Sequence, residues 1–281
     1  MLATLIIVFR EMIEAGLIVG IVLSATRGVP RRGAWVAGGV VAGVLGACIV
    51  ASFAGAISQS MEGYGQELFN VGILTFAVFM LTWHNVWMAR HGREMAIHMK
   101  AVGQEVASGT RSLMALAIVV GIAVLREGSE IVLFLYGILV SGQDSASMMA
   151  VGGLGGVILG AALSTVIYYG LVRIPLRSLF KVTSWLIALL AAGMAAQAIA
   201  LLQQAQVIHV LGDVVWNTSA LIPDRSIAGK VLHTLIGYTA RPTGMQVAVY
   251  AGTLAIIFTL MRLFGHVPRK PAPMLSEPGV A

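Results

Sequence analysis

Residues 2–25 read L-A-T-L-I-I-V-F-R-E-M-I-E-A-G-L-I-V-G-I-V-L-S-A, an apolar run with Arg10, Glu11 and Glu14 near its middle. At 1.5 Å per residue, a helix of this length crosses the roughly 30 Å hydrocarbon core of a bilayer. Each ionised side chain at the centre of such a helix costs about 2.5–3.5 kcal/mol if it faces lipid. The three charged residues therefore indicate a polar site inside a bundle of membrane helices.

Further apolar stretches of similar length predict seven transmembrane helices in all. They are residues 2–25, 34–58, 68–89, 112–140, 148–172, 182–204 and 246–265. Lysine and arginine gather in the connectors 26–33, 90–111 and 173–181, whereas 59–67 and 141–147 contain neither. By the positive-inside rule, this distribution places the N-terminus outside and the C-terminus in the cytoplasm.

The composition agrees with a multi-pass protein of the cell membrane and excludes several other classes. Hydrophobic residues make up 58% of the chain and charged residues 11%, whereas soluble proteins carry about 25% charged residues. The single cysteine, Cys48, excludes an intrachain disulfide or a cysteine-based metal site. We attribute the net charge of +6 to cytoplasmic loops rather than to nucleic-acid binding. The chain has no P-loop and no zinc-protease motif, so we predict no enzyme activity.

The charged pattern of the first stretch recurs in the fourth. Arg126-Glu127-Gly128-Ser129-Glu130 lies 116 residues after Arg10-Glu11-Met12-Ile13-Glu14 (126 minus 10). Three predicted helices lie in each unit, and an odd number inverts the second copy relative to the first. We therefore predict an all-α membrane protein with two inverted three-helix repeats and a seventh helix outside them.

These boundaries give a single transmembrane domain over residues 1–265. Repeat one covers about 1–110, repeat two about 111–205, an outer loop 206–245 and the seventh helix 246–265. Residues 266–281 contain four prolines and few apolar residues, so we expect a flexible cytoplasmic tail. The apolar spacing within 205–220 predicts an amphipathic helix on the outer surface.

The spacing of the motif brings its charges together. On a helix, positions i, i+1 and i+4 fall within an arc of about 100°, and the arginine can pair with the second glutamate. Two such helices in contact would gather four carboxylates, balanced by two guanidiniums. The carboxylates are Glu11, Glu14, Glu127 and Glu130, and the guanidiniums are Arg10 and Arg126. Such a set suits a hard multivalent cation, and the alternative is a pair of structural Arg–Glu links.

The two motifs and their flanks resemble the oxidase-dependent iron permeases, comprising the fungal high-affinity iron permease and the bacterial Efe-type permeases. Matching flanks are Q-E-L-F at Gln66–Phe69, L-T-W at Leu81–Trp83, F-K-V-T-S at Phe180–Ser184, A-A-G-M-A-A at Ala191–Ala196 and I-G-Y at Ile236–Tyr238. Asn70 and Asn217 stand where members often carry acidic residues. The resemblance implies iron as the transported substrate, without a cofactor, and an extracytoplasmic iron-binding or iron-oxidising partner protein.

The oxidase partners of this family favour ferric iron, and ferrous iron is the alternative. A different divalent metal, or an organic solute coupled to protons, is the second hypothesis for the substrate. Glu62, Glu67 and Asp144 are predicted to lie at the outer ends of helices, where they could attract cations or simply be solvated. His84, predicted near the inner end of the third helix, is a candidate exit ligand or proton relay, or a hydrogen-bonded packing residue.

Overall fold

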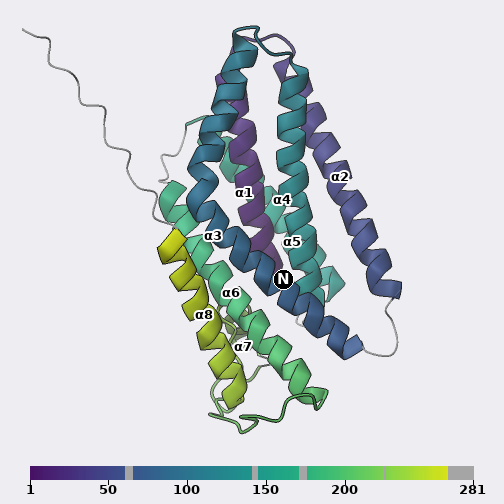
Figure 1. Cartoon of the computed structure of the whole chain (residues 1–281), viewed down its shortest axis with the longest axis vertical. Coiled ribbons are helices and arrows are strands. Elements are labelled where there is room, and N and C mark those ends of the chain that lie inside the picture. The colour runs from purple at the N-terminus through teal and green to yellow at the C-terminus, as the bar shows by residue number, and fades with distance from the viewer. Residues whose placement is uncertain (61–65, 141–144, 171–175, 225, 265–281) are drawn as a thin grey trace, which may run out of the picture.

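The computed structural model describes residues 1–60, 66–140, 145–170, 176–224 and 226–264 (Figure 1). Within these ranges the chain forms eight helices and no strand beyond an isolated bridge between Val214 and Thr243. The helices are α1 Leu2–Ala25, α2 Arg32–Ser60, α3 Gln66–Ala107, α4 Met114–Val140, α5 Ala146–Tyr168, α6 Leu176–Gln204, α7 Ile227–Ile236 and α8 Gly244–Phe264. The helix α1 contacts α3, α4 and α5, while α6 packs between α3 and α8.

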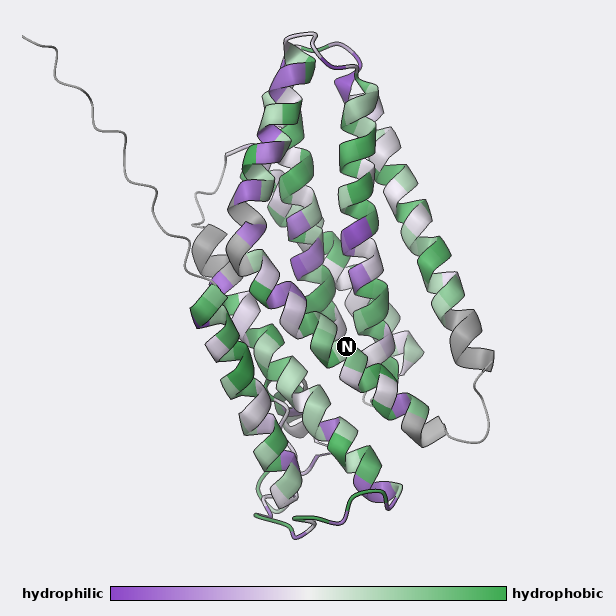
Figure 2. Ribbon diagram, viewed as in Figure 1, coloured by the Kyte–Doolittle hydropathy of each residue, from purple (hydrophilic) through white to green (hydrophobic). Residues whose placement is uncertain are grey.

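Helices long and apolar enough to cross a bilayer dominate the described chain. Five segments meet this description by length and composition: Arg32–Ala54, Phe69–Met88, Ala146–Tyr168, Lys181–Gln204 and Gly244–Phe264. The helices α1 and α4, with 24 and 27 residues, are also long enough to cross a bilayer, but each carries an arginine and two glutamates. Figure 2 shows hydrophobic colour along most of each long helix, with hydrophilic positions near the middle of the bundle. The prediction of an all-helical membrane protein is confirmed.

The third helix is much longer than predicted. We expected a connector over residues 90–111, but α3 continues to Ala107 and contains 42 residues. Residues 90–107 contain no proline, and Met99, Val102 and Val106 are buried. Met99 and Val106 pack against buried residues of α1, α2 and α4, and this packing stabilises the extra turns.

The predicted amphipathic helix over 205–220 is absent, since this segment consists of turns and bends. Gln206 and Leu211 have φ angles of 57° and 52°, in the left-handed region that interrupts a right-handed helix. The helix of the outer loop is α7 instead. Ser226 caps its start by accepting a hydrogen bond from the Gly229 N–H, and Gly237 ends it with φ of 68°.

Glycines bring two pairs of helices into close contact. A Cβ added at Gly39 or Gly43 of α2 would lie 2.5 Å or 2.7 Å from a backbone oxygen of α4. A Cβ added at Gly156 or Gly160 of α5 would lie 2.8 Å or 2.6 Å from a Cβ atom of α1. The close packing of small residues is typical of membrane helices, which lack a hydrophobic driving force between them.

The two glycine contacts have the same register. Gly39 faces Ala117 and Gly152 faces Met1, while Gly43 faces Val124 and Gly156 faces Val8. The faced residues differ by 116 positions in both cases (117 minus 1, and 124 minus 8), which is also the offset between the charged motifs. Contacts advance together along each pair, so α2 runs parallel to α4 and α1 runs parallel to α5.

The direction of α4 relative to α1 follows from these contacts. The helix α2 begins shortly after α1 ends, and its first turns lie beside the first turns of α4. The end of α1 and the start of α4 therefore lie at the same end of the bundle. The two motif-bearing helices therefore run antiparallel.

Substitution of glycine by alanine tests this packing. We expect Gly39→Ala and Gly156→Ala each to lower stability by about 1–3 kcal/mol, because the new methyl group overpacks a helix contact. Gly38→Ala and Gly153→Ala are matched controls, since a Cβ at Gly38 meets nothing within 4 Å and one at Gly153 meets only Thr4 at 3.9 Å. Thermal unfolding of each purified variant in detergent measures the difference. Equal melting temperatures for Gly39→Ala and Gly38→Ala would contradict the close approach.

Candidate metal centre

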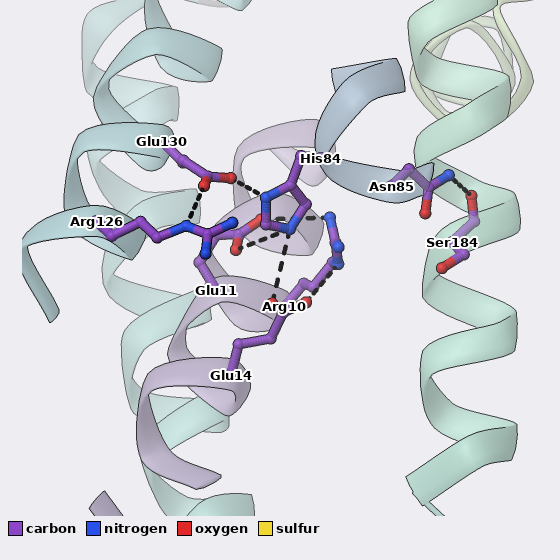
Figure 3. Close-up of polar contacts among 8 residues, drawn as sticks. All are labelled: Arg10, Glu11, Glu14, His84, Asn85, Arg126, Glu130 and Ser184. Atoms are coloured by element: carbon purple, nitrogen blue, oxygen red, sulfur yellow. Dashed lines mark hydrogen bonds and ion pairs between the residues drawn. The ribbon is translucent and has the colours of Figure 1, made fainter. Parts of the chain in front are cut away.

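The two charged motifs meet where α1 crosses α4, in the interior of the bundle (Figure 3). Their relative exposures are 1% for Arg10, 0% for Glu11, 3% for Glu14, 4% for Glu127 and 8% for Glu130. Charged residues are almost never this buried unless they are paired or bind a metal. The bundle therefore places all four predicted carboxylates away from lipid.

The motif on α1 is linked within itself. Arg10 Nε lies 2.9 Å from Glu14 Oε1, and Arg10 Nη1 lies 3.4 Å from Glu11 Oε1. The first of these contacts is the i, i+4 pair expected from the sequence. A buried guanidinium between two buried carboxylates offsets much of the cost of removing them from water.

The motif on α4 has a different environment. Arg126 Nε also pairs with its i+4 partner, at 3.1 Å from Glu130 Oε1. However, the Arg126 side chain is 32% exposed, and its guanidinium lies 4.0 Å from the centre of the Trp87 ring. The aromatic face provides a cation–π contact, so Arg126 depends less on the carboxylates than Arg10 does.

His84 of α3 lies between the two motifs, with 2% exposure. Its Nδ1 contacts Glu130 Oε2. Its Nε2 lies 3.6 Å from Glu14 Oε2 and 3.9 Å from Glu11 Oε2. We predicted His84 near the inner end of the third helix, and this position was wrong. Because α3 extends from Gln66 to Ala107, residue 84 lies near its middle, at the level of the motifs.

Four residues form a compact group that could hold a metal ion, which we call the donor set. They are Glu11, His84, Glu127 and Glu130, and one ligand atom from each lies within 4.8 Å of the others. Oxygens of the three glutamates and both ring nitrogens of His84 are buried, and although His84 contacts Glu130 and Glu11, none of these atoms has a hydrogen bond of good geometry in the described part of the chain. Such groups are costly to bury unsatisfied, and a bound cation would satisfy them.

Glu14 stands slightly apart from the donor set. One of its oxygens pairs with Arg10 and the other faces His84 Nε2. The geometry therefore brings three of the four predicted carboxylates together with a histidine, and it leaves the fourth beside the ring. Sequence spacing could not reveal this, because His84 comes from a third helix.

Asn85 supports the site from the next position along α3, and no pattern in the sequence indicated this role. Its side chain is buried, and its Nδ2 donates to the backbone oxygen of Ser184 in α6 at 3.0 Å. This bond fixes the turn of α3 that carries His84 (Figure 3). In the outer loop, Asn217 Oδ1 accepts hydrogen bonds from Ser219 and from Arg241, so it cross-links that loop.

The predicted residues for cation access lie beyond what the structure describes. Glu62 and Asp144 fall in ranges outside the described residues, and the side chain of Glu67 is not described either. The tail 266–281 lies outside them as well. The attraction of cations by Glu62, Glu67 and Asp144 stays a prediction.

The sequence also matches a known protein family. The profile of the iron permease FTR1 family matches residues 1–267. The chain belongs to this family. FTR1 proteins are permeases, that is, transporters, and a family member with these apolar helices is a multi-pass membrane protein, in bacteria a protein of the inner membrane.

Curated relatives of this FTR1 chain agree with the family. The ferrous iron permease EfeU of Yersinia pestis is 32% identical over 277 residues, covering 97% of this chain and 96% of its own length. The protein of the same name from Escherichia coli O6:H1 is 32% identical over 256 residues, covering 89% and 91% respectively. No solved structure matches the chain. The resemblance to bacterial Efe-type permeases is confirmed.

Proposed function

We propose that the protein imports iron across the cytoplasmic membrane through the buried site between α1 and α4. The observation that carries the proposal is the donor set, in which three carboxylates and an imidazole converge within 4.8 Å inside a member of an iron permease family. Carboxylate and imidazole ligands both suit iron. Glu11, Glu127 and Glu130 are the proposed carboxylate ligands of the cation, Glu14 supports them from beside the His84 ring, and Arg10 and Arg126 are the balancing charges.

The arrangement of helices supports an inverted-repeat transporter. We propose that α1 to α3 and α4 to α6 are the two repeats, with α8 as the seventh membrane helix and α7 in the outer loop. The antiparallel crossing of α1 and α4 and the common 116-residue offset of their glycine contacts support this assignment. Such repeats rock around a site near the midplane and expose it to each side in turn.

The charges of the chain and of its substrate are the basis for the proposed orientation and driving force. The proposed topology places the N-terminus outside and residues 266–281 in the cytoplasm. Inward movement of a cation gains about 2.3 kcal/mol per charge per 100 mV of membrane potential. The potential therefore favours uptake, and an extracytoplasmic iron-binding or iron-oxidising protein is the proposed donor.

Uptake of radioactive iron into proteoliposomes tests this function. Purified protein is reconstituted, an inside-negative potential is imposed, and ferric citrate or ascorbate-reduced ferrous iron is offered separately. We expect saturable uptake well above that of protein-free liposomes. The resemblance to oxidase-dependent permeases favours ferric iron, whereas the names of the curated relatives favour ferrous iron, and the two arms separate these alternatives.

Competition identifies the substrate. Manganese at tenfold excess should leave most of the iron uptake intact, whereas zinc, which imidazole also binds well, should compete more strongly. Preferential uptake of manganese or zinc would contradict the iron proposal and favour the transport of another divalent metal. Proton movement without any metal uptake would favour an organic solute coupled to protons.

A further inference from the structure

The His84 ring is held in a fixed orientation. Asn85, the next residue, ties this turn of α3 to α6 through Ser184. The Phe134 ring of α4 lies edge-on to the imidazole, with 6.4 Å between ring centres and an angle of 80°. With the ring so placed, one nitrogen faces α4 at Glu130 and the other faces α1 at Glu14 (Figure 3).

Carboxylates alone do not explain how such a site would select a transition metal. Mg²⁺ and Ca²⁺ prefer oxygen ligands, and carboxylates bind both. Imidazole, in contrast, favours iron, zinc, copper and nickel. The only nitrogen ligand in the donor set is His84. We propose that His84 ligates the transported cation directly and lets the site discriminate iron from Mg²⁺ and Ca²⁺, an inference that rests on the function proposed above.

The geometry fits this role. Ligands on opposite sides of a metal with bonds of about 2.1 Å lie roughly 4.2 Å apart. The ligand atoms of the donor set lie within 4.8 Å of one another, so a small inward movement closes the site. Both ring nitrogens face carboxylates of the donor set, Nδ1 at Glu130 and Nε2 at Glu11. We assign Nδ1 as the coordinating nitrogen because Nε2 lies nearer to Glu14, at 3.6 Å, which is outside the donor set.

The second ring nitrogen also has a suitable partner. A metal-bound histidine usually donates its other N–H to a carboxylate, which fixes the ring and strengthens the ligand. Nε2 of His84 lies 3.6 Å from Glu14 Oε2, and Glu14 is anchored in turn by Arg10 at 2.9 Å. Glu14 thus orients the histidine, which explains why it stands apart from the other three carboxylates.

A purely structural histidine would behave differently. If His84 only linked Glu14 to Glu130, its loss would weaken the binding of every cation to the same extent. If it is a ligand, its loss weakens iron binding more than Mg²⁺ or Ca²⁺ binding. The ratio of affinities therefore separates the two roles, and so does direct detection of a nitrogen ligand on the bound metal.

The test measures binding of radioactive ferrous iron to full-length protein in nanodiscs, free of any affinity tag. Wild type is compared with His84→Gln and with His98→Gln, a matched control at an exposed position of the same helix. We expect His84→Gln to weaken iron binding at least tenfold and to lower at least tenfold the excess of Ca²⁺ that displaces half the iron. His98→Gln should change neither value. An unchanged ratio in His84→Gln would overturn the inference.

X-ray absorption spectroscopy of iron bound to the wild type gives a second measurement that needs no variant to fold. The multiple-scattering pattern of an imidazole on iron supports the inference, and its absence overturns it. A wild type that binds iron without an imidazole contradicts only the role of His84. A wild type that binds no iron contradicts the proposed function as well.

Discussion

Replacement of Glu11 and Glu127 together by glutamine is expected to lower iron uptake at least a hundredfold. The two residues come from different motifs, and each contributes a buried carboxylate to the donor set. The double variant removes two of its three carboxylates while keeping the side-chain volume. The proteoliposome assay with radioactive iron measures the loss.

A matched control separates the site from the general effect of losing charge. Glu105 lies on α3 with a side chain that is 46% exposed, and it pairs with Arg111 at 2.8 Å. Glu105→Gln should leave uptake unchanged. If the Glu11 and Glu127 double variant folds and still transports iron at the wild-type rate, the motifs are structural links between helices and the donor set is not the iron site.

The interior polar site was predictable because charged side chains are costly in the middle of a membrane helix. Arg10 and Glu14 cannot face lipid without a large cost, so their place in an apolar run located an interior site from the sequence alone. The recurrence at Arg126 and Glu130 then gave a second helix for the same site. The i, i+4 pairs of both motifs are present in the structure.

The depth of His84 could not be predicted, because it depends on where a helix ends rather than on a local pattern. Basic residues after position 89 indicated a loop, yet Met99 and Val106 pack against α1, α2 and α4 and continue the helix. Tertiary packing thus overrode the polarity of the segment. In the same way, the left-handed conformation of Gln206 and Leu211 overrode the apolar spacing of 205–220.

The unequal roles of the two arginines were also beyond sequence reasoning, since the motifs that contain them have the same charges. Arg10 is buried and paired with Glu11 and Glu14 of the same helix, whereas Arg126 lies over Trp87 and is partly exposed. The difference comes from α3, whose Trp87 ring contacts the Arg126 guanidinium, whereas its His84 lies between the two motifs. The two arginines are therefore expected to contribute unequally to stability.

Arg10→Gln is expected to destabilise the protein by about 3–5 kcal/mol, the cost of removing one partner from a buried ion pair. Its loss leaves Glu11 and Glu14 buried with no guanidinium beside them on α1. Arg126→Gln should cost clearly less, because that side chain is 32% exposed and its guanidinium also contacts the Trp87 ring. Thermal unfolding in detergent, with the amount of membrane-inserted protein as a second readout, measures both.

The double variant Arg10→Gln with Glu14→Gln shows whether charge is the cause. If the cost arises from an unpaired carboxylate, removal of that carboxylate restores part of the lost stability, and the two substitutions are not additive. Additive losses would mean that Arg10 acts by packing alone. Equal losses for Arg10→Gln and Arg126→Gln would contradict the asymmetry of the two motifs. The cycle thus tests whether Arg10 stabilises the carboxylates of α1 before a cation binds. If it does, an arriving cation can replace Arg10 as the partner of these carboxylates.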